Sequence, residues 1–163
     1  MRGEINRGWR SLAGLAGFVA LGLAVGAVGG VVTQTTVGGW YQTLAKPPFN
    51  PPDSVFAPVW TTLFVLMSVA AWRVWRLGGW RRRRGDLTLY FIQLGLNVIW
   101  SVLFFGLRAP GWALVEIMVL LAAITWTTIR FARRDRWAGV LMAPYVLWVA
   151  FAVVLNGAIW RLN

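Results

Sequence analysis

The side chains with which this chain can do chemistry are aromatic rings and amides rather than nucleophiles or metal ligands. It contains 12 tryptophans and 9 phenylalanines but neither cysteine nor histidine. The chain therefore lacks a thiol nucleophile, the usual general base and the commonest side-chain ligands of zinc and haem iron. The sequence predicts no metal site and no obligate cofactor, and it favours non-covalent binding over nucleophilic catalysis.

Three stretches place these rings and amides on single helical faces. They are Trp60, Phe64, Met67 and Ala71; Gln93, Asn97, Trp100 and Phe104; and Tyr145, Trp148, Ala152 and Asn156. Spacings of three and four residues put side chains on one side of an α-helix. One interpretation is a packed core in which the amides join helices. The other is a pocket walled by rings and rimmed by amides, which suits a flat apolar ligand.

The elements that must position these side chains are membrane-spanning helices. Hydrophobic residues make up 58% of the chain and charged residues 13%, which is unlike a soluble domain. A hydrocarbon core about 30 Å thick needs roughly 20 apolar residues in a helix. Five stretches qualify, at about 11–33, 55–77, 87–107, 112–132 and 138–160. Short connections predict an all-α integral membrane protein, one domain over 1–163 folded as a five-transmembrane-helix up-down bundle.

The connection between the first two spans, residues 34–54, is expected to form a lid. It contains Pro47, Pro48, Pro51 and Pro52, together with the only lysine of the chain. Proline fixes the backbone and removes hydrogen-bond donors, so this loop should be rigid rather than floppy. It leads directly into the helix that carries Trp60.

Charge is distributed unevenly between the two ends of the predicted bundle. The net charge of +11 raises the possibility of a nucleic-acid partner, but the arrangement favours a topological signal instead. Twelve arginines fall on the side of the N-terminus and the second and fourth loops, against three cations opposite. They are Arg2, Arg7, Arg10, Arg76, Arg81, Arg82, Arg83, Arg84, Arg130, Arg133, Arg134 and Arg136, against Lys46, Arg108 and Arg161. The positive-inside rule then predicts a cytoplasmic N-terminus, an outer lid and no nucleic-acid binding.

Four tryptophans lie away from the predicted span ends, at positions 60, 100, 126 and 148. An indole N–H within hydrocarbon needs a partner, so these rings are expected to face protein or a ligand.

Glu116 is expected to pair with Arg108 or to act as a helix N-terminal charge, rather than to relay protons.

Small residues at Gly22, Gly26 and Gly30 permit close helix contact, within one chain or between two.

Five segments resemble the translocator protein family, also called tryptophan-rich sensory proteins and peripheral benzodiazepine receptors. They are WYQTLAKPPFNPP (Trp40–Pro52), FAPVWTTLFVLM (Phe56–Met67), QLGLNVIWSVLFFG (Gln93–Gly106), GWALVE (Gly111–Glu116) and APYVLWVAFAVVLNGAIWRLN (Ala143–Asn163). They occur in the family's order and spacing and cover nearly everything after Trp40. The resemblance implies a five-helix receptor or sensory protein, usually a homodimer, whose internal pocket is closed by the first loop.

The family's ligands are porphyrins such as protoporphyrin IX and haem-type tetrapyrroles, sterol-like lipids and benzodiazepine-type compounds. Family positions and helical spacing together predict one ligand-binding set. It comprises Tyr41, Pro51, Trp60, Phe64, Gln93, Asn97, Trp100, Phe104, Tyr145, Trp148, Ala152 and Asn156. A transport or regulatory role in tetrapyrrole metabolism is expected, in a bacterial cell membrane or an outer membrane.

An enzymatic alternative stays open. Trp60 and Trp148 match the two tryptophans that the family associates with light-dependent porphyrin breakdown, and they are the candidates for a catalytic role. A sterol or porphyrin transporter is the other alternative.

The chain also departs from the family pattern. Ser54 and Phe49 make the lid less aromatic, and Gly157 replaces the tyrosine of the animal sterol motif.

Overall fold

The computed structural model describes the backbone of residues 2–163 and the side chains of residues 8–163. The side chains of Arg2 and Arg7, which the positive-inside prediction counts, lie outside the described residues. Over residues 2–163 the structure is helical and contains no strand, as the sequence predicts.

Five helices are long and apolar enough to cross a membrane in the described chain. They are α1 (Arg2–Val37), α3 (Asp53–Arg76), α4 (Gly79–Ser101) with its π-helical extension η1 (Val102–Gly106), α5 (Pro110–Ala132) and α6 (Arg136–Leu162). A further short helix, α2 (Trp40–Thr43), lies in the first connection. The prediction of a membrane protein with five apolar helices is confirmed.

Three limits of helices differ from the limits of the predicted spans and lid. α1 continues to Val37 and α2 covers Trp40–Thr43, so the irregular part of the lid is shorter than 34–54. The third span begins at Gly79 instead of 87, because its first turns contain the arginines 81–84. Arginine is a good helix former, so the helix extends beyond the apolar stretch that the prediction measured.

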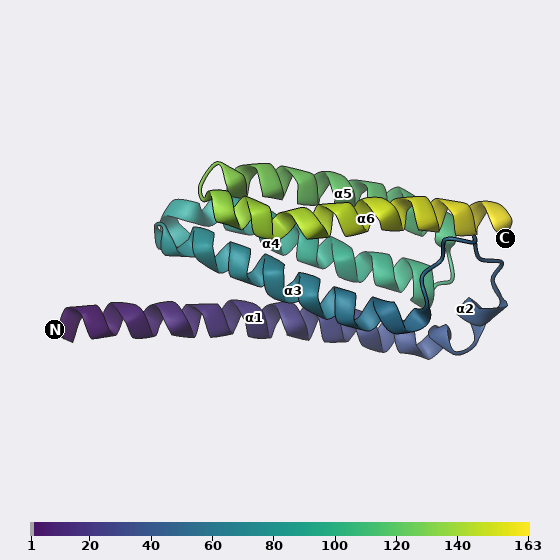
Figure 1. Ribbon diagram of the computed structural model, residues 1–163, viewed down its shortest axis with the longest axis horizontal. Coiled ribbons are helices and arrows are strands. Elements are labelled where there is room, and N and C mark those ends of the chain that lie inside the picture. Colours follow the sequence, from purple (N-terminus) through teal and green to yellow (C-terminus); the bar gives the residue numbers. More distant parts are fainter. Residues whose placement is uncertain (1) are drawn as a thin grey trace.

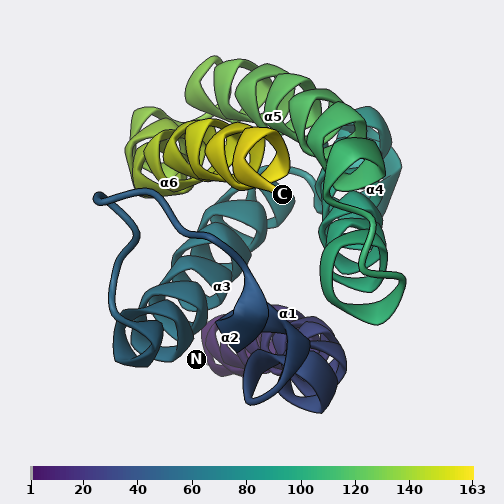
Figure 2. The same cartoon turned by 90° about the vertical axis from the view of Figure 1, so that its right-hand side faces the viewer.

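The long helices form a ring in the order α1, α3, α6, α5, α4, which Figure 2 shows from the lid end. α6 packs against both α5 and α3, and α4 packs against α5 and α1. The second span thus lies beside the fifth, although two spans separate them in the chain. This arrangement lets side chains from α3, α4 and α6 face a common centre.

The lid and the C-terminus lie at one end of the molecule, and the α3–α4 and α5–α6 turns lie at the other (Figure 1). The turn end is held by ion pairs between helices. The buried carboxylate of Asp86 lies 2.7 Å from Arg130 Nη2 and 3.1 Å from Arg134 Nε. Arg73 lies 2.9 Å from Asp135, whose side chain also caps the start of α6.

α1 and α3 approach closely at two glycines. A methyl group on Gly22 would overlap Ser68 Oγ, and one on Gly26 would lie 2.7 Å from the ring of Phe64. Gly30 has nothing within 4 Å of that position. The close contact that the glycine repeat predicts is therefore made within one chain at Gly22 and Gly26.

Candidate functional site

A small, partly open space lies beneath the lid, where α2, α3, α4, η1 and α6 converge. We call it the inner space. It is lined by Tyr41, Phe56, Trp60, Trp100, Phe104, Phe105, Trp148, Ala152, Leu155, Asn156 and Ile159. Its volume is about 30 Å³, which is room for roughly one water molecule. The aromatic walls therefore fill most of the volume that they surround.

Seven of the twelve predicted ligand-binding residues line the inner space. They are Tyr41, Trp60, Trp100, Phe104, Trp148, Ala152 and Asn156. Each of the three helical stripes contributes to this set, and α2 adds one ring from the lid. The spacing argument thus identified side chains that meet in space, although they come from distant parts of the chain.

The rings of this space pack against one another in edge-to-face and stacked pairs. Trp100 stacks on Phe104 with ring centroids 5.4 Å apart and planes 28° from parallel. Tyr41 meets Phe104 edge to face at 6.3 Å. Trp148 meets Phe56 at 6.0 Å, also edge to face. Such pairs are the favoured geometries of aromatic side chains, and a flat ligand offers the same kind of surface.

The π-helical turn η1 brings two consecutive phenylalanines to the inner space. Its geometry is marked by a hydrogen bond from the Leu107 N–H to the carbonyl of Val102, 2.8 Å long and five residues apart. In a regular α-helix, neighbouring residues point about 100° apart. The wider turn lets Phe104 and Phe105 both line the space and both contact Tyr41. Single π turns are frequent at functional sites.

The predicted amides form hydrogen bonds between helices. Asn156 on α6 accepts from Trp100 Nε1 at 3.2 Å and donates to the carbonyl of Pro110 at 2.8 Å, which joins three helices. Asn97 donates to the Tyr145 hydroxyl at 3.2 Å. Gln93 donates to the sulfur of Met67, and its Oε1 has no partner among the described residues. These bonds match the interpretation of the amides as links between helices, and Asn156 also lines the inner space.

Five predicted residues do not line the inner space. Phe64, Gln93, Asn97 and Tyr145 are buried in the next layer of the core, further from the lid. The link between the two layers is Trp60, whose ring lies 6.0 Å from Phe64 and 6.2 Å from Tyr145. Pro51 lies in the lid loop and is partly exposed.

The lid is fastened to the bundle through side chains. Asn163 donates to the carbonyl of Ala45 at 3.1 Å and accepts from its N–H at 3.0 Å, which ties the loop to the end of α6. The Tyr41 hydroxyl donates to Asn50 Oδ1 at 3.1 Å. Lys46 Nζ lies 4.1 Å from the centre of the Tyr41 ring, within the range of a cation–π contact. The lid is thus tied to the bundle through Asn163, and the two contacts of Tyr41 hold the lid residues together.

Tyr41 sits between the lid and the inner space and is buried. Burial raises the pKa of its hydroxyl to about 12, the negative charge of Asp53 adds to the rise, and the hydrogen bond with Asn50 opposes it. The ring is therefore neutral throughout the physiological range and presents an uncharged surface to the inner space.

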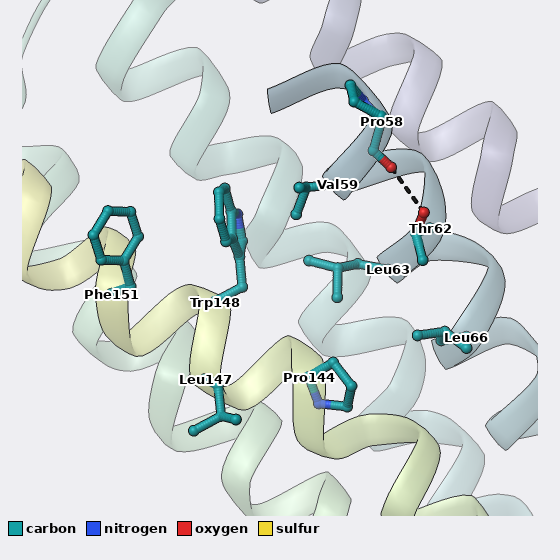
Figure 3. A pocket seen from close by; sticks show the side chains of 9 residues that line it. All are labelled: Pro58, Val59, Thr62, Leu63, Leu66, Pro144, Leu147, Trp148 and Phe151. Carbon is teal, nitrogen blue, oxygen red and sulfur yellow. Dashed lines mark hydrogen bonds between the residues drawn. The ribbon is translucent and has the colours of Figure 1, made fainter. Parts of the chain in front are cut away.

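A second, larger cavity opens on the outer surface between α3 and α6, and we call it the lateral groove (Figure 3). Its volume is about 560 Å³, within the usual range of ligand sites. It is lined by Pro58, Val59, Thr62, Leu63, Leu66, Pro144, Leu147, Trp148 and Phe151. The one hydroxyl in this lining, that of Thr62, donates to the carbonyl of Pro58 at 2.9 Å. The groove therefore presents an apolar surface.

Sequence reasoning missed four residues of the inner space. Phe56 precedes Trp60 by one turn, and Leu155 and Ile159 continue the α6 stripe by another turn, so extending each stripe would have found them. Phe105 depends on the π turn, for which the sequence gives no signal.

Two expectations about single residues are wrong. Trp126 is 54% exposed on α5, so this deep tryptophan does not face the protein interior. Glu116 makes no ion pair with Arg108 and lies beyond the first turn of α5, and both its carboxylate oxygens are buried without a hydrogen-bond partner among the described residues.

The chain is similar to known proteins over most of its length. The sequence profile of the TspO/MBR family matches residues 18–161. The "Tryptophan-rich protein TspO" of Chlorobaculum tepidum is 43% identical over 152 residues, which cover 91% of this chain and 95% of the relative. The "Tryptophan-rich sensory protein" of Cereibacter sphaeroides is 42% identical over 124 residues, 76% of this chain and 77% of the relative. The "Translocator protein" of Homo sapiens is 40% identical over 126 residues, 76% and 75% of the two chains.

Proposed function

The chain belongs to the TspO/MBR family, and from this premise we propose that it is a membrane receptor that binds porphyrins and related flat, apolar ligands beneath its lid. It is a multi-pass integral membrane protein with a receptor or sensory role typical of its relatives. One observation carries the proposal: rings from α2, α3, α4, η1 and α6 converge on a single space with one amide, Asn156, at its edge.

The chemistry of this space suits a macrocycle. Aromatic pairs contribute about 0.5–1.5 kcal/mol each beyond the burial of apolar area, and a porphyrin presents two broad faces to such rings. The porphyrin carboxylates would lie toward the lid end, near Lys46 or Arg161. Because the inner space has a volume of about 30 Å³, binding requires the rings or the lid to move apart.

Titration with protoporphyrin IX tests the proposal. Absorbance and tryptophan fluorescence are recorded for the protein in lipid nanodiscs and for a variant carrying Trp60→Leu and Trp148→Leu. Loss of two ring contacts is expected to weaken binding by about 1–3 kcal/mol, or roughly 5- to 150-fold. A matched control carries Trp112→Leu and Trp126→Leu, since both of these rings are exposed. Equal affinity of the two double variants would refute the assignment of the site.

Light-dependent porphyrin breakdown is a second candidate function, because Trp60 and Trp148 both line the inner space and would contact a bound macrocycle. Product analysis with and without illumination tests it. Porphyrin loss no faster than that with an equal amount of free tryptophan would exclude this activity.

The remaining assignments belong to the same proposal. We propose an up-down bundle that acts as a homodimer, which the family resemblance supports. We also propose a cytoplasmic N-terminus, which the uneven distribution of arginines supports. Benzodiazepine-type and sterol-like ligands would compete for the inner space, and displacement of bound protoporphyrin IX measures this competition.

A further inference from the structure

The lateral groove and the inner space are separated by one side chain, that of Trp148. Among the residues whose side chains the structure describes, this is the one that lines both cavities. Figure 3 shows its ring rising from α6 toward α3, between Phe151 on its own helix and Val59 on the facing one. A rotation of this ring would therefore join a cavity of about 560 Å³ to one of about 30 Å³.

From this geometry we propose that flat apolar ligands reach the inner space sideways, from the hydrocarbon of the bilayer, through the lateral groove, with Trp148 as its movable wall. The inference rests on the proposed function, because it describes how that ligand enters. It differs from a route through the lid, which would admit ligand from water.

The position of the groove identifies its occupant. α3 and α6 are both membrane spans, so the groove is continuous with the lipid-facing surface of the protein. Its walls are aliphatic, prolyl and aromatic, and the Thr62 hydroxyl is already paired. Such a surface suits a molecule dissolved in hydrocarbon, and the only lining side-chain donor without a partner among the described residues is the Trp148 indole N–H.

Trp148 is held by fewer directional contacts than Trp100, its neighbour in the inner space. The Trp100 indole N–H is held by Asn156 at 3.2 Å. Trp148 makes no hydrogen bond among the described residues and is held by packing against the core, including rings of Phe151 at 5.6 Å and Phe56 at 6.0 Å. Burial of apolar surface is non-directional, so this packing can be replaced by other apolar contacts after a rotation of the ring.

Both walls of the groove contain a proline inside a helix, Pro58 in α3 and Pro144 in α6. A helical proline removes one backbone hydrogen bond and allows the helix to bend at that point. The two helices that must separate are thus weakened where they face each other. The lid, in contrast, is tied to the end of α6 by two hydrogen bonds between Asn163 and Ala45, and contacts of Tyr41 with Asn50 and Lys46 hold its own shape.

Covalent bridges test the two routes, because the chain contains no cysteine of its own. One variant carries Thr62→Cys and Leu147→Cys, one on each wall of the groove, joined by a bis-maleimide. The matched control carries Ala45→Cys and Asn163→Cys, joined in the same way, and locks the lid to α6. The single-cysteine variants capped with a monofunctional maleimide control for the label. Association of protoporphyrin IX is followed by stopped-flow tryptophan fluorescence in nanodiscs.

Bridging the groove should slow association at least 10-fold and leave the equilibrium affinity within 2-fold, because entry and exit slow together. Bridging the lid should change the rate less than 2-fold. Thr62→Trp, which fills the groove without a bridge, should also slow association. An unchanged rate in the groove-bridged protein, or a slow rate only in the lid-bridged protein, would overturn the lateral route while leaving binding intact. Absence of binding in the unbridged protein would overturn the proposed function and the route together.

Discussion

Replacement of Asn156 by leucine should loosen the meeting point of three helices. The leucine side chain has nearly the same size, so the change removes hydrogen bonds while keeping most of the volume. Two bonds are lost: the one accepted from Trp100 Nε1 at 3.2 Å and the one donated to the Pro110 carbonyl at 2.8 Å. An indole N–H and a carbonyl are then left without their partner.

The expected loss follows from the number and kind of bonds. Hydrogen bonds between membrane helices contribute about 0.6 kcal/mol on average and about 1.7 at most. Two such bonds set the destabilisation at about 1–3 kcal/mol. Because Trp100 also stacks on Phe104 at 5.4 Å, its release should disturb the wall of the inner space and weaken protoporphyrin IX binding as well.

A double-mutant cycle isolates the bond to Trp100. Trp100→Phe removes the N–H and keeps a ring at that position, and reversible unfolding in mixed micelles gives the free energy of each variant. The pair Asn156→Leu and Trp100→Phe should show a coupling energy of about 0.5–1.7 kcal/mol. The same cycle with Trp112→Phe, an exposed ring, should be additive. Additivity in both cycles would refute the idea that this bond fixes the wall.

Three further changes test other parts of the structure. Gly22→Ala should lower the free energy of unfolding by about 1–3 kcal/mol, because the added methyl group would overlap α3. Gly17→Ala is the control: its methyl group would have nothing within 4 Å, so this change should raise the free energy of unfolding by up to about 1 kcal/mol. Since the pKa of Tyr41 is raised to about 12 from 10.0, the folded protein holds a proton that the unfolded chain releases. The contribution of Tyr41 to stability should therefore be constant below pH 10 and fall between pH 10 and 12, and Tyr41→Phe should remove this fall. Asp86→Asn should lower the free energy of unfolding by about 1–3 kcal/mol, because it removes the charge of a buried carboxylate that is paired with two half-exposed arginines. Asp53→Asn, at an exposed position, should change the free energy of unfolding by less than about 0.5 kcal/mol.

The sequence predicted the elements of this protein better than their exact limits. Apolar stretches of membrane-spanning length located all five long helices, because hydrocarbon imposes one length on each. The limits of α1 and α4 were wrong where polar residues continue a helix beyond the apolar stretch, as the arginines 81–84 do. Hydropathy measures burial in lipid, whereas helix ends depend on backbone hydrogen bonds.

Helical spacing predicted three faces whose side chains meet inside the protein, but it did not predict the orientation of Trp126. Trp60, Trp100 and Trp148 converge because their helices turn the same stripes inward, while Trp126 lies on a face of α5 that is exposed. The π turn that adds Phe105 changes the spacing locally, and the size of the inner space depends on ring orientations. Neither property can be read from the period of a sequence.

The order of the helices around the ring also bears on how the protein is made. α6 packs between α5 and α3, and it supplies Trp148, Ala152, Leu155, Asn156 and Ile159 to the inner space. During synthesis, the four long helices before α6 enter the membrane first. The face of α3 that later packs against α6 is therefore exposed to lipid until α6 is inserted. The binding site is consequently completed only after the remainder of the bundle has been inserted. A pause in translation before α6 would lengthen the time during which other molecules can reach that flank.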